Sequence, residues 1–122
     1  MSTIKTETLS TPSNATVPVD TVVNGTAKAW VNFNGTGTVA IRRAFNVSSI
    51  TDRGTGLYGV TFTTAMSDAN YAVLATNGRG GWIASLQTQN SPNTTTGIYE
   101  LRSCDASGTN QDIEDFYVAV FS

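Results

Sequence analysis

Hydrophobic and polar residues alternate with a period of two along several short segments in the first half of the chain. In the first segment, Ala29, Val31 and Phe33 fall on one side of an extended chain, and Trp30 and Asn32 fall on the other. A period of two over about four to eight residues is typical of a half-buried β-strand. The same period recurs over residues 39–41, 45–47 and 58–62.

Glycine-bearing segments separate these predicted strands. Residues 34–37 read Asn-Gly-Thr-Gly, and residues 52–56 read Asp-Arg-Gly-Thr-Gly. Glycine adopts the positive φ angles that tight reversals between antiparallel strands require. The alternation and the turns together predict an antiparallel meander or the core of a sandwich.

The second half of the chain continues in the same way. A polar connection over residues 66–70 has room for one loose helical turn. Strands are predicted over residues 71–75, 82–86, 98–104 and 116–121. The first and last of these are apolar on both faces, which predicts a central position for 71–75 and a place mid-sheet or under a neighbouring subunit for 116–121. About eight strands at this spacing predict an all-β fold, an antiparallel two-sheet sandwich of jelly-roll-like type.

The first 26 residues differ from the remainder. Ile4 and Leu9 are the only large apolar residues before Val17 apart from the initial methionine, so this segment cannot offset its ordering entropy alone. It is either a disordered tail or an extended arm that pairs with a neighbouring subunit or another protein, since residues 3–9 alternate weakly, as an added edge strand would. The predicted organisation is an extended N-terminal attachment arm, 1–26, followed by a β-sandwich knob, 27–122.

Longer strings in the chain carry a resemblance to a family. They are KAWVNFNGTGTVAIR from residue 28, FNVSSITD from 45 and FTTAM from 62, with VPVDTVV before them and YELRS and FYVAVF after them. Together they resemble a module of tail-fibre and other virion surface proteins of tailed bacteriophages, especially those of aquatic bacteria. The similarity runs from about Val17 to Val73 and resumes in the last two predicted strands.

The resemblance implies a non-enzymatic structural protein of the virion, assembled as a homotrimer. Because we find no secretory leader, we expect the chain to be made in the host cytoplasm. Residues 1–26 would attach it to another virion protein of the tail, the baseplate or the capsid. The sandwich loops would contact the host surface, including a surface glycan. The resemblance implies no catalytic residue.

Two other functions stay open. A capsid cement or decoration protein would clamp major capsid subunits with its arm, and a chain of 122 residues, with no room for a fibre shaft, favours that alternative. A free carbohydrate-binding module would instead be a soluble monomer that binds sugar and does not need its arm. Copy number on the particle distinguishes a cement protein from a fibre.

Composition and charge narrow the possible partners. Only 13% of residues are charged and the net charge is −2, against about 25% charged residues in typical domains. Arg42-Arg43 is the one basic cluster, and adjacent strand positions point to opposite faces, so nucleic acid is not an expected partner. We find neither a secretory leader nor an apolar run long enough for membrane insertion.

The candidate chemistry is sparse. The chain has no histidine, which removes Ser-His-Asp and Cys-His catalysis and imidazole zinc sites. Asp112, Glu114 and Asp115 are close enough in sequence to raise a carboxylate pair or a calcium site, although a solvated loop end is the simpler interpretation. Cys104 is expected to be a small core residue. We therefore predict no catalytic residue, no metal and no cofactor.

Two tryptophans are candidates for recognition. Trp30 faces away from the predicted core, which favours a subunit contact. Trp82 follows a glycine-rich loop, 77–81, where it could stack on a sugar while polar neighbours bind the sugar hydroxyls; a core position is the alternative. Because loops on a rigid sandwich can change in sequence at little cost in stability, we expect host contact through loops 77–81, 88–97 and 105–112. The predicted receptor contacts are Asn77, Arg79, Trp82 and Asn93, and the predicted subunit contacts are Ile4, Leu9, Val17, Trp30, Tyr117 and Phe121.

Overall fold

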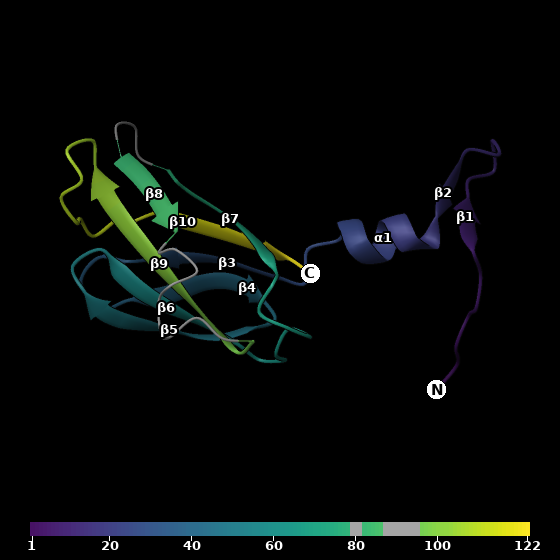
Figure 1. Ribbon diagram of the computed structural model, residues 1–122, viewed down its shortest axis with the longest axis horizontal. Helices are drawn as coiled ribbons and strands as arrows, with labels where there is room; N and C mark the ends of the chain where they lie inside the picture. Colours follow the sequence, from purple (N-terminus) through teal and green to yellow (C-terminus); the bar gives the residue numbers. More distant parts are fainter. Residues whose placement is uncertain (79–81, 87–95) are drawn as a thin grey trace.

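The computed structural model of the chain describes residues 1–78, 82–86 and 96–122. Within these residues the chain forms ten strands and one short helix (Figure 1). In order, they are β1 (Thr8–Ser10), β2 (Thr16–Pro18), α1 (Val19–Gly25), β3 (Ala29–Asn34), β4 (Ala40–Phe45), β5 (Val47–Gly54), β6 (Leu57–Phe62), β7 (Ala72–Asn77), β8 (Trp82–Leu86), β9 (Ile98–Asp105) and β10 (Phe116–Phe121).

Eight strands build two antiparallel sheets, which pack on each other as a sandwich. One sheet has the order β4-β3-β10-β7 and the other has the order β5-β6-β9-β8. The chain crosses between the sheets from β4 to β5, and β7 lies beside β8 at the opposite corner. The all-β sandwich predicted from the sequence is therefore confirmed.

The core lies between the sheets and is built by the predicted alternation. Residues at every second position of β3, β6 and β10 are buried. Three rings form its centre: Phe33 stacks on Phe116 at 5.1 Å between centroids, and Tyr58 meets the edges of both at 5.3 and 5.7 Å. Such pairs add about 0.5–1.5 kcal/mol each beyond the burial of their area.

Asn46 interrupts a segment that the alternation predicts as one strand, 45–47. Its φ of 52° is in the left-handed region, which asparagine tolerates better than most residues. Its side chain donates to the Lys28 carbonyl at 3.0 Å and accepts from the Thr64 amide at 2.7 Å. The break lets the chain leave one sheet at Phe45 and enter the other at Val47.

The two strands predicted to be apolar on both faces occupy different positions in one sheet. Strand β10 lies between β3 and β7, as predicted. Strand β7 was expected to be central but lies at the edge of the same sheet, so that prediction is wrong. Its outward residue Leu74 is 60% exposed. Apolar residues on both faces therefore do not mark β7 as a strand buried within this single chain.

The N-terminal arm is less extended than predicted. A β1–β2 hairpin turns at Asn14, whose φ is 62°, and α1 follows directly from Pro18, with Asp20 in its first turn, where a carboxylate favours the helix dipole. No residue of α1 is buried. The loose turn expected over 66–70 contains only bends.

The arm and the sandwich are physically distinct. Every residue from 1 to 26 is at least partly exposed, and the core cluster draws its members from Ala29 onward. In Figure 1 the arm projects from one end of the sandwich, in line with its long axis.

The ring cluster gives the first prediction. Replacing Phe33 with alanine leaves a cavity against Tyr58 and Phe116, so the free energy of unfolding should fall by about 3–5 kcal/mol. Chemical denaturation measures this fall. The matched control is Ile4→Ala, at a side chain 90% exposed, which should change stability by no more than about 0.5 kcal/mol. Equal effects of the two substitutions would contradict the placement of the core.

Candidate interaction surfaces

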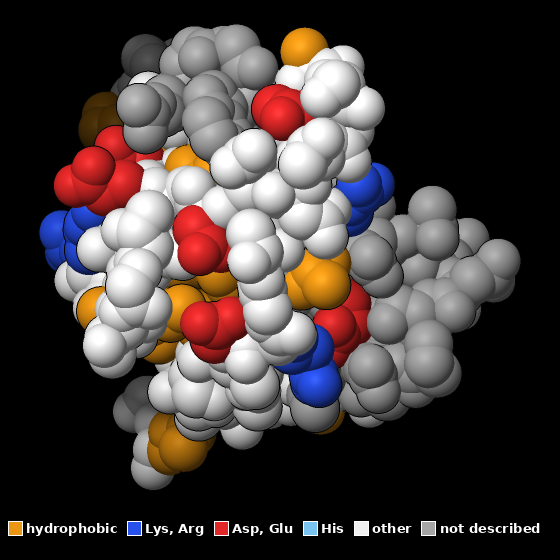
Figure 2. All heavy atoms as spheres, turned by 90° about the vertical axis from the view of Figure 1, so that its left-hand side faces the viewer, with side chains coloured by type: hydrophobic (Ala, Val, Ile, Leu, Met, Phe, Trp, Pro, Cys, Tyr) orange, Lys and Arg blue, Asp and Glu red, His pale blue; other side chains and the backbone are white. Residues whose placement is uncertain are grey.

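The end of the sandwich far from the arm collects four connections, which we call the tip: residues 35–39, 55–56, 78 and 106–115. They follow or precede strand ends that share this side of the molecule (Figure 1). Figure 2 looks onto this end, where polar groups dominate the described surface and acidic side chains are spread among them.

The segment 106–115 ties the tip together through backbone hydrogen bonds. Ile113 accepts from the Gly35 amide at 2.8 Å, and Asp115 accepts from the Gly78 amide at 3.1 Å. Ser103 donates through its amide to Gly56 at 2.8 Å and accepts from the Gln111 amide at 3.1 Å. The other connections, 35–39, 55–56 and 78, are thus each hydrogen-bonded to the segment 106–115 or to β9, the strand that leads into it.

A buried tyrosine links the core to the tip. The Tyr58 hydroxyl lies 2.9 Å from the Gly35 carbonyl oxygen and 3.1 Å from the Asp112 carboxylate, and that carboxylate also accepts from the Gly56 amide at 2.8 Å. Burial, reinforced by the negative charge of Asp112, raises the pKa of Tyr58 from 10.0 to about 12. Asp112 is therefore occupied in holding the loop.

Asp105 organises the β9–β10 connection locally. One carboxylate oxygen accepts from the Ser107 amide at 2.9 Å, the Ser107 hydroxyl at 2.6 Å and the Thr109 amide at 3.0 Å. The Ser107 hydroxyl, followed by the Thr109 amide, lowers the pKa of Asp105 below its ordinary value. This carboxylate is a turn-forming group, since its acceptor capacity serves neighbouring residues.

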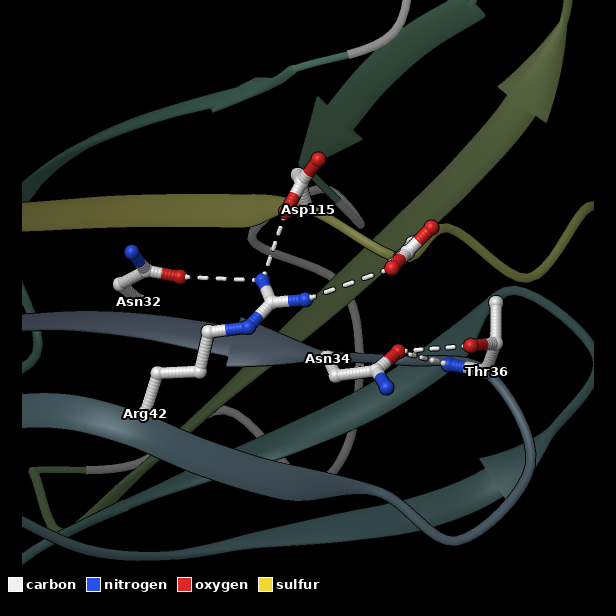
Figure 3. Close-up of polar contacts among 6 residues, drawn as sticks. Asn32, Asn34, Thr36, Arg42 and Asp115 are labelled. Carbon is white, nitrogen blue, oxygen red and sulfur yellow. Dashed lines mark hydrogen bonds and ion pairs between the residues drawn. The ribbon is translucent and has the colours of Figure 1, made fainter.

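Arg42, in β4, contacts both the tip and the neighbouring strand β3 (Figure 3). Its guanidinium donates to Asp115 at 2.7 Å and to Asn32 at 3.4 Å, and it approaches Glu114 at 3.9 Å. The register shifts at Asn32, which pairs with Arg43, and Phe33 pairs with Ile41. The assumption that adjacent arginines point to opposite faces is wrong here, because Arg42 is the extra residue of a β-bulge.

The three carboxylates considered for chemistry have different surroundings. The Asp112 carboxylate accepts hydrogen bonds from Gly56 and Tyr58, and Asp115 forms an ion pair with Arg42. The Glu114 side chain is 69% exposed. Across residues 1–78, 82–86 and 96–122, no three carboxylate or cysteine side chains gather as a metal site would require. Cys104 is buried, as predicted.

The predicted receptor contacts do not form one described cluster. Asn77 ends β7, half-buried, opposite Phe116. Trp82 begins β8 opposite Asp105, but its side chain lies outside the described residues, as do Arg79 and Asn93. Loops 77–81 and 105–112 begin at the tip end of the sandwich. The described end of loop 88–97, by contrast, is held near Met66 and Phe62, at the end where the arm emerges.

The predicted subunit contacts fall into two groups. Ile4, Leu9 and Val17 lie on the arm, where Ile4 is exposed and Val17 is half-buried. Trp30, Tyr117 and Phe121 share the outer face of the β4-β3-β10-β7 sheet. Two strongly exposed members of that face, Leu74 and Phe45, were not among the predicted contacts. They could have been found from the strands that are apolar on both sides, because a sandwich core covers only one side of each strand.

Comparison with other proteins identifies no family for this chain, so the fold alone defines its class. No protein-family model, no curated protein and no solved structure matches the chain. The fold defines an all-β sandwich with a separate arm. Helix α1 spans seven residues, and the described chain contains no helix with the length and apolar character needed to cross a membrane.

Two glycines of the tip allow a test of its close packing. Gly56 and Gly37 both have positive φ, 67° and 59°, but a Cβ at Gly56 would lie 2.5 Å from the Ser103 carbonyl oxygen, whereas a Cβ at Gly37 would meet nothing within 4 Å. Gly37→Ala should lower the free energy of unfolding by about 1–2 kcal/mol, and Gly56→Ala by about 2–5 kcal/mol. Denaturation curves that give equal losses would contradict the account of the tip.

Tyr58 predicts a loss of stability in alkali. Its pKa is raised on folding, so its contribution is fully present below pH 10.0 and is lost as the pH rises through about 12. Tyrosinate absorbance should show one of the four tyrosines titrating late, and Tyr58→Phe should remove that late step. A folded wild-type protein whose tyrosines all ionise near pH 10.0 would contradict this assignment.

Proposed function

We propose that this protein is a non-enzymatic structural component of a tailed-bacteriophage virion. The sandwich is a knob that forms a homotrimer, the arm attaches it to another virion protein, and the tip contacts the host surface. The sequence resemblance to virion surface modules motivates the class. The separation of arm and knob supports the division of labour.

The arm is the observation that carries this proposal. A helix of seven residues and a hairpin of two three-residue strands are each marginal in water. No residue of the arm is buried in the described structure, and Ile4, Leu9, Val22 and Val23 are exposed. Such a segment gains stable structure when a partner covers its apolar residues.

The tip has properties suited to contact with a foreign surface. Its backbone is fixed by hydrogen bonds to Gly35, Gly56 and Gly78, so its polar side chains are presented by a preformed frame. Hydroxyl, amide and carboxylate groups are the partners that glycan hydroxyls require. The tip and the arm lie at opposite ends of the molecule (Figure 1), which permits attachment and contact at the same time.

A capsid cement protein is the alternative that the arm also favours. A short hairpin and helix that project from a folded knob suit a clamp over the joint between neighbouring capsid subunits. Copy number distinguishes the two: a cement protein is present over the whole head, whereas a fibre is present in a few copies at the tail.

The test removes the arm and measures incorporation. A chain lacking residues 1–20, expressed during infection, should fold but should be absent from purified particles, because attachment runs through the deleted segment. The matched control keeps the arm and carries Ser107→Ala at the tip; it should be incorporated as the wild type is.

Quantitative mass spectrometry of the particles measures occupancy and copy number together. Normal occupancy of the truncated chain would contradict attachment by the arm. A soluble monomer that binds sugar and never enters particles would instead favour a free carbohydrate-binding module.

A further inference from the structure

A row of apolar side chains crosses the outer face of the β4-β3-β10-β7 sheet. The register places Leu74 beside Ala119, Ala119 beside Trp30, and Trp30 beside Phe45. Leu74 is 60% exposed and Phe45 is 54% exposed. We call this surface, with the adjoining Tyr117 and Phe121, the outer face.

The opposite sheet shows what a solvated face looks like in this fold. Its outward positions on β5 include Ser49 and Thr51, both polar and exposed. An antiparallel sheet with one solvated side normally carries polar residues there. A contiguous apolar row in that position marks an interaction surface.

The arm of the same chain does not cover this row. The Lys28 amide donates to the Val120 carbonyl at 2.7 Å, and the Lys28 ammonium contacts the Val23 carbonyl. These contacts fix the direction in which α1 leaves β3, away from the sandwich (Figure 1). A return onto the outer face would have to break the contact between Lys28 and Val23.

The outer face carries both a hollow and large projecting side chains. Ala119 is the small residue of the row, and a hollow of about 300 Å³ lies there between Leu74 and Tyr117. Large side chains on the same surface, Leu74, Trp30 and Phe45, supply projections of the kind that enter such a hollow. Interdigitation of large and small residues is how flat sheet faces pack about 10 Å apart.

The charges bordering the outer face are also balanced. Arg42 is paired with Asp115, whereas Arg43 is exposed and has no ion-pair partner among the described residues. Glu114, near Arg42, is 69% exposed. At the tip edge of this face the two arginines and the two carboxylates cancel, so copies meet there without net repulsion, and Arg43 of one copy can pair with Glu114 of another. A polyanion would require a net positive face.

We propose that copies of this chain associate through the outer face, with the row from Leu74 to Phe45 as the buried centre of the contact. The inference rests on the homotrimer of the proposed function and identifies the surface that forms it. Association of the purified protein does not depend on the virion, so a failure of this surface is distinguishable from a failure of the virion role, which the particle-incorporation experiment tests.

The first test places a charge in the centre of the row. Leu74→Glu should make the protein monomeric, because a carboxylate buried without a partner opposes association. Ser49→Glu, the matched control, adds the same charge to the outer side of the other sheet and should leave association unchanged. Sedimentation equilibrium of the full chains over a range of concentrations gives the mass, and circular dichroism checks that each variant is folded.

The second test examines the pairing of Arg43 with Glu114, and asks whether a neighbour's arm covers the row instead. Arg43→Glu should weaken association at least tenfold, and adding Glu114→Arg should restore most of that loss. The knob without residues 1–26 retains the whole core cluster, and it should associate as the full chain does. If its association is lost, a neighbour's arm covers the row instead.

A wild-type mass of three copies that falls to one in Leu74→Glu would support the proposal, and a wild-type dimer would contradict the homotrimer on which it rests. A wild-type monomer at every concentration, an associated Leu74→Glu variant, loss of association on removing the arm, or no rescue by the double charge exchange would overturn it.

Discussion

The structure depends on the burial of one side of each sheet against the other. Phe33, Phe116 and Tyr58 meet at the centre of that layer, and the buried alternate positions of β3, β6 and β10 follow from it. A two-sheet sandwich can bury only its two inner faces. Apolar residues on an outward face are therefore left for a second contact, and the most exposed ones that the structure describes in the sandwich, Leu74 and Phe45, lie on one sheet.

The same burial positions the tip. Tyr58 extends from the core to Gly35 and Asp112, so the loops are fastened to the buried core cluster. Both glycines that take part in this network, Gly35 and Gly56, lack space for a side chain. The resulting frame is preformed, which lowers the entropy lost when its polar groups contact a partner. The arm, which shares none of this burial, lies at the other end.

Sequence analysis predicted the sandwich and the sides of its strands because alternation directly reflects burial. It missed the break at Asn46 because an asparagine in the left-handed region has no unique local signal. It missed α1 because seven residues with valines at positions 19, 22 and 23 are too short to establish a helical period. These are failures of short-range patterns where a single residue or turn decides the structure.

The candidate surfaces were harder to predict than the fold. Tyr58 and Asp112 are 54 residues apart, and only the pairing of strands brings them together. Strand 71–75 was placed mid-sheet because both of its sides are apolar. The pattern was real, but at Leu74 it indicates a face that the single chain leaves exposed.

A side-chain-resolution map of the protein assembled on its particle tests the central claim most directly. The account predicts that neighbouring copies cover the row formed by Leu74, Ala119, Trp30 and Phe45, and that the arm lies against a different virion protein. A knob that stands alone on the particle with this row facing solvent would contradict it.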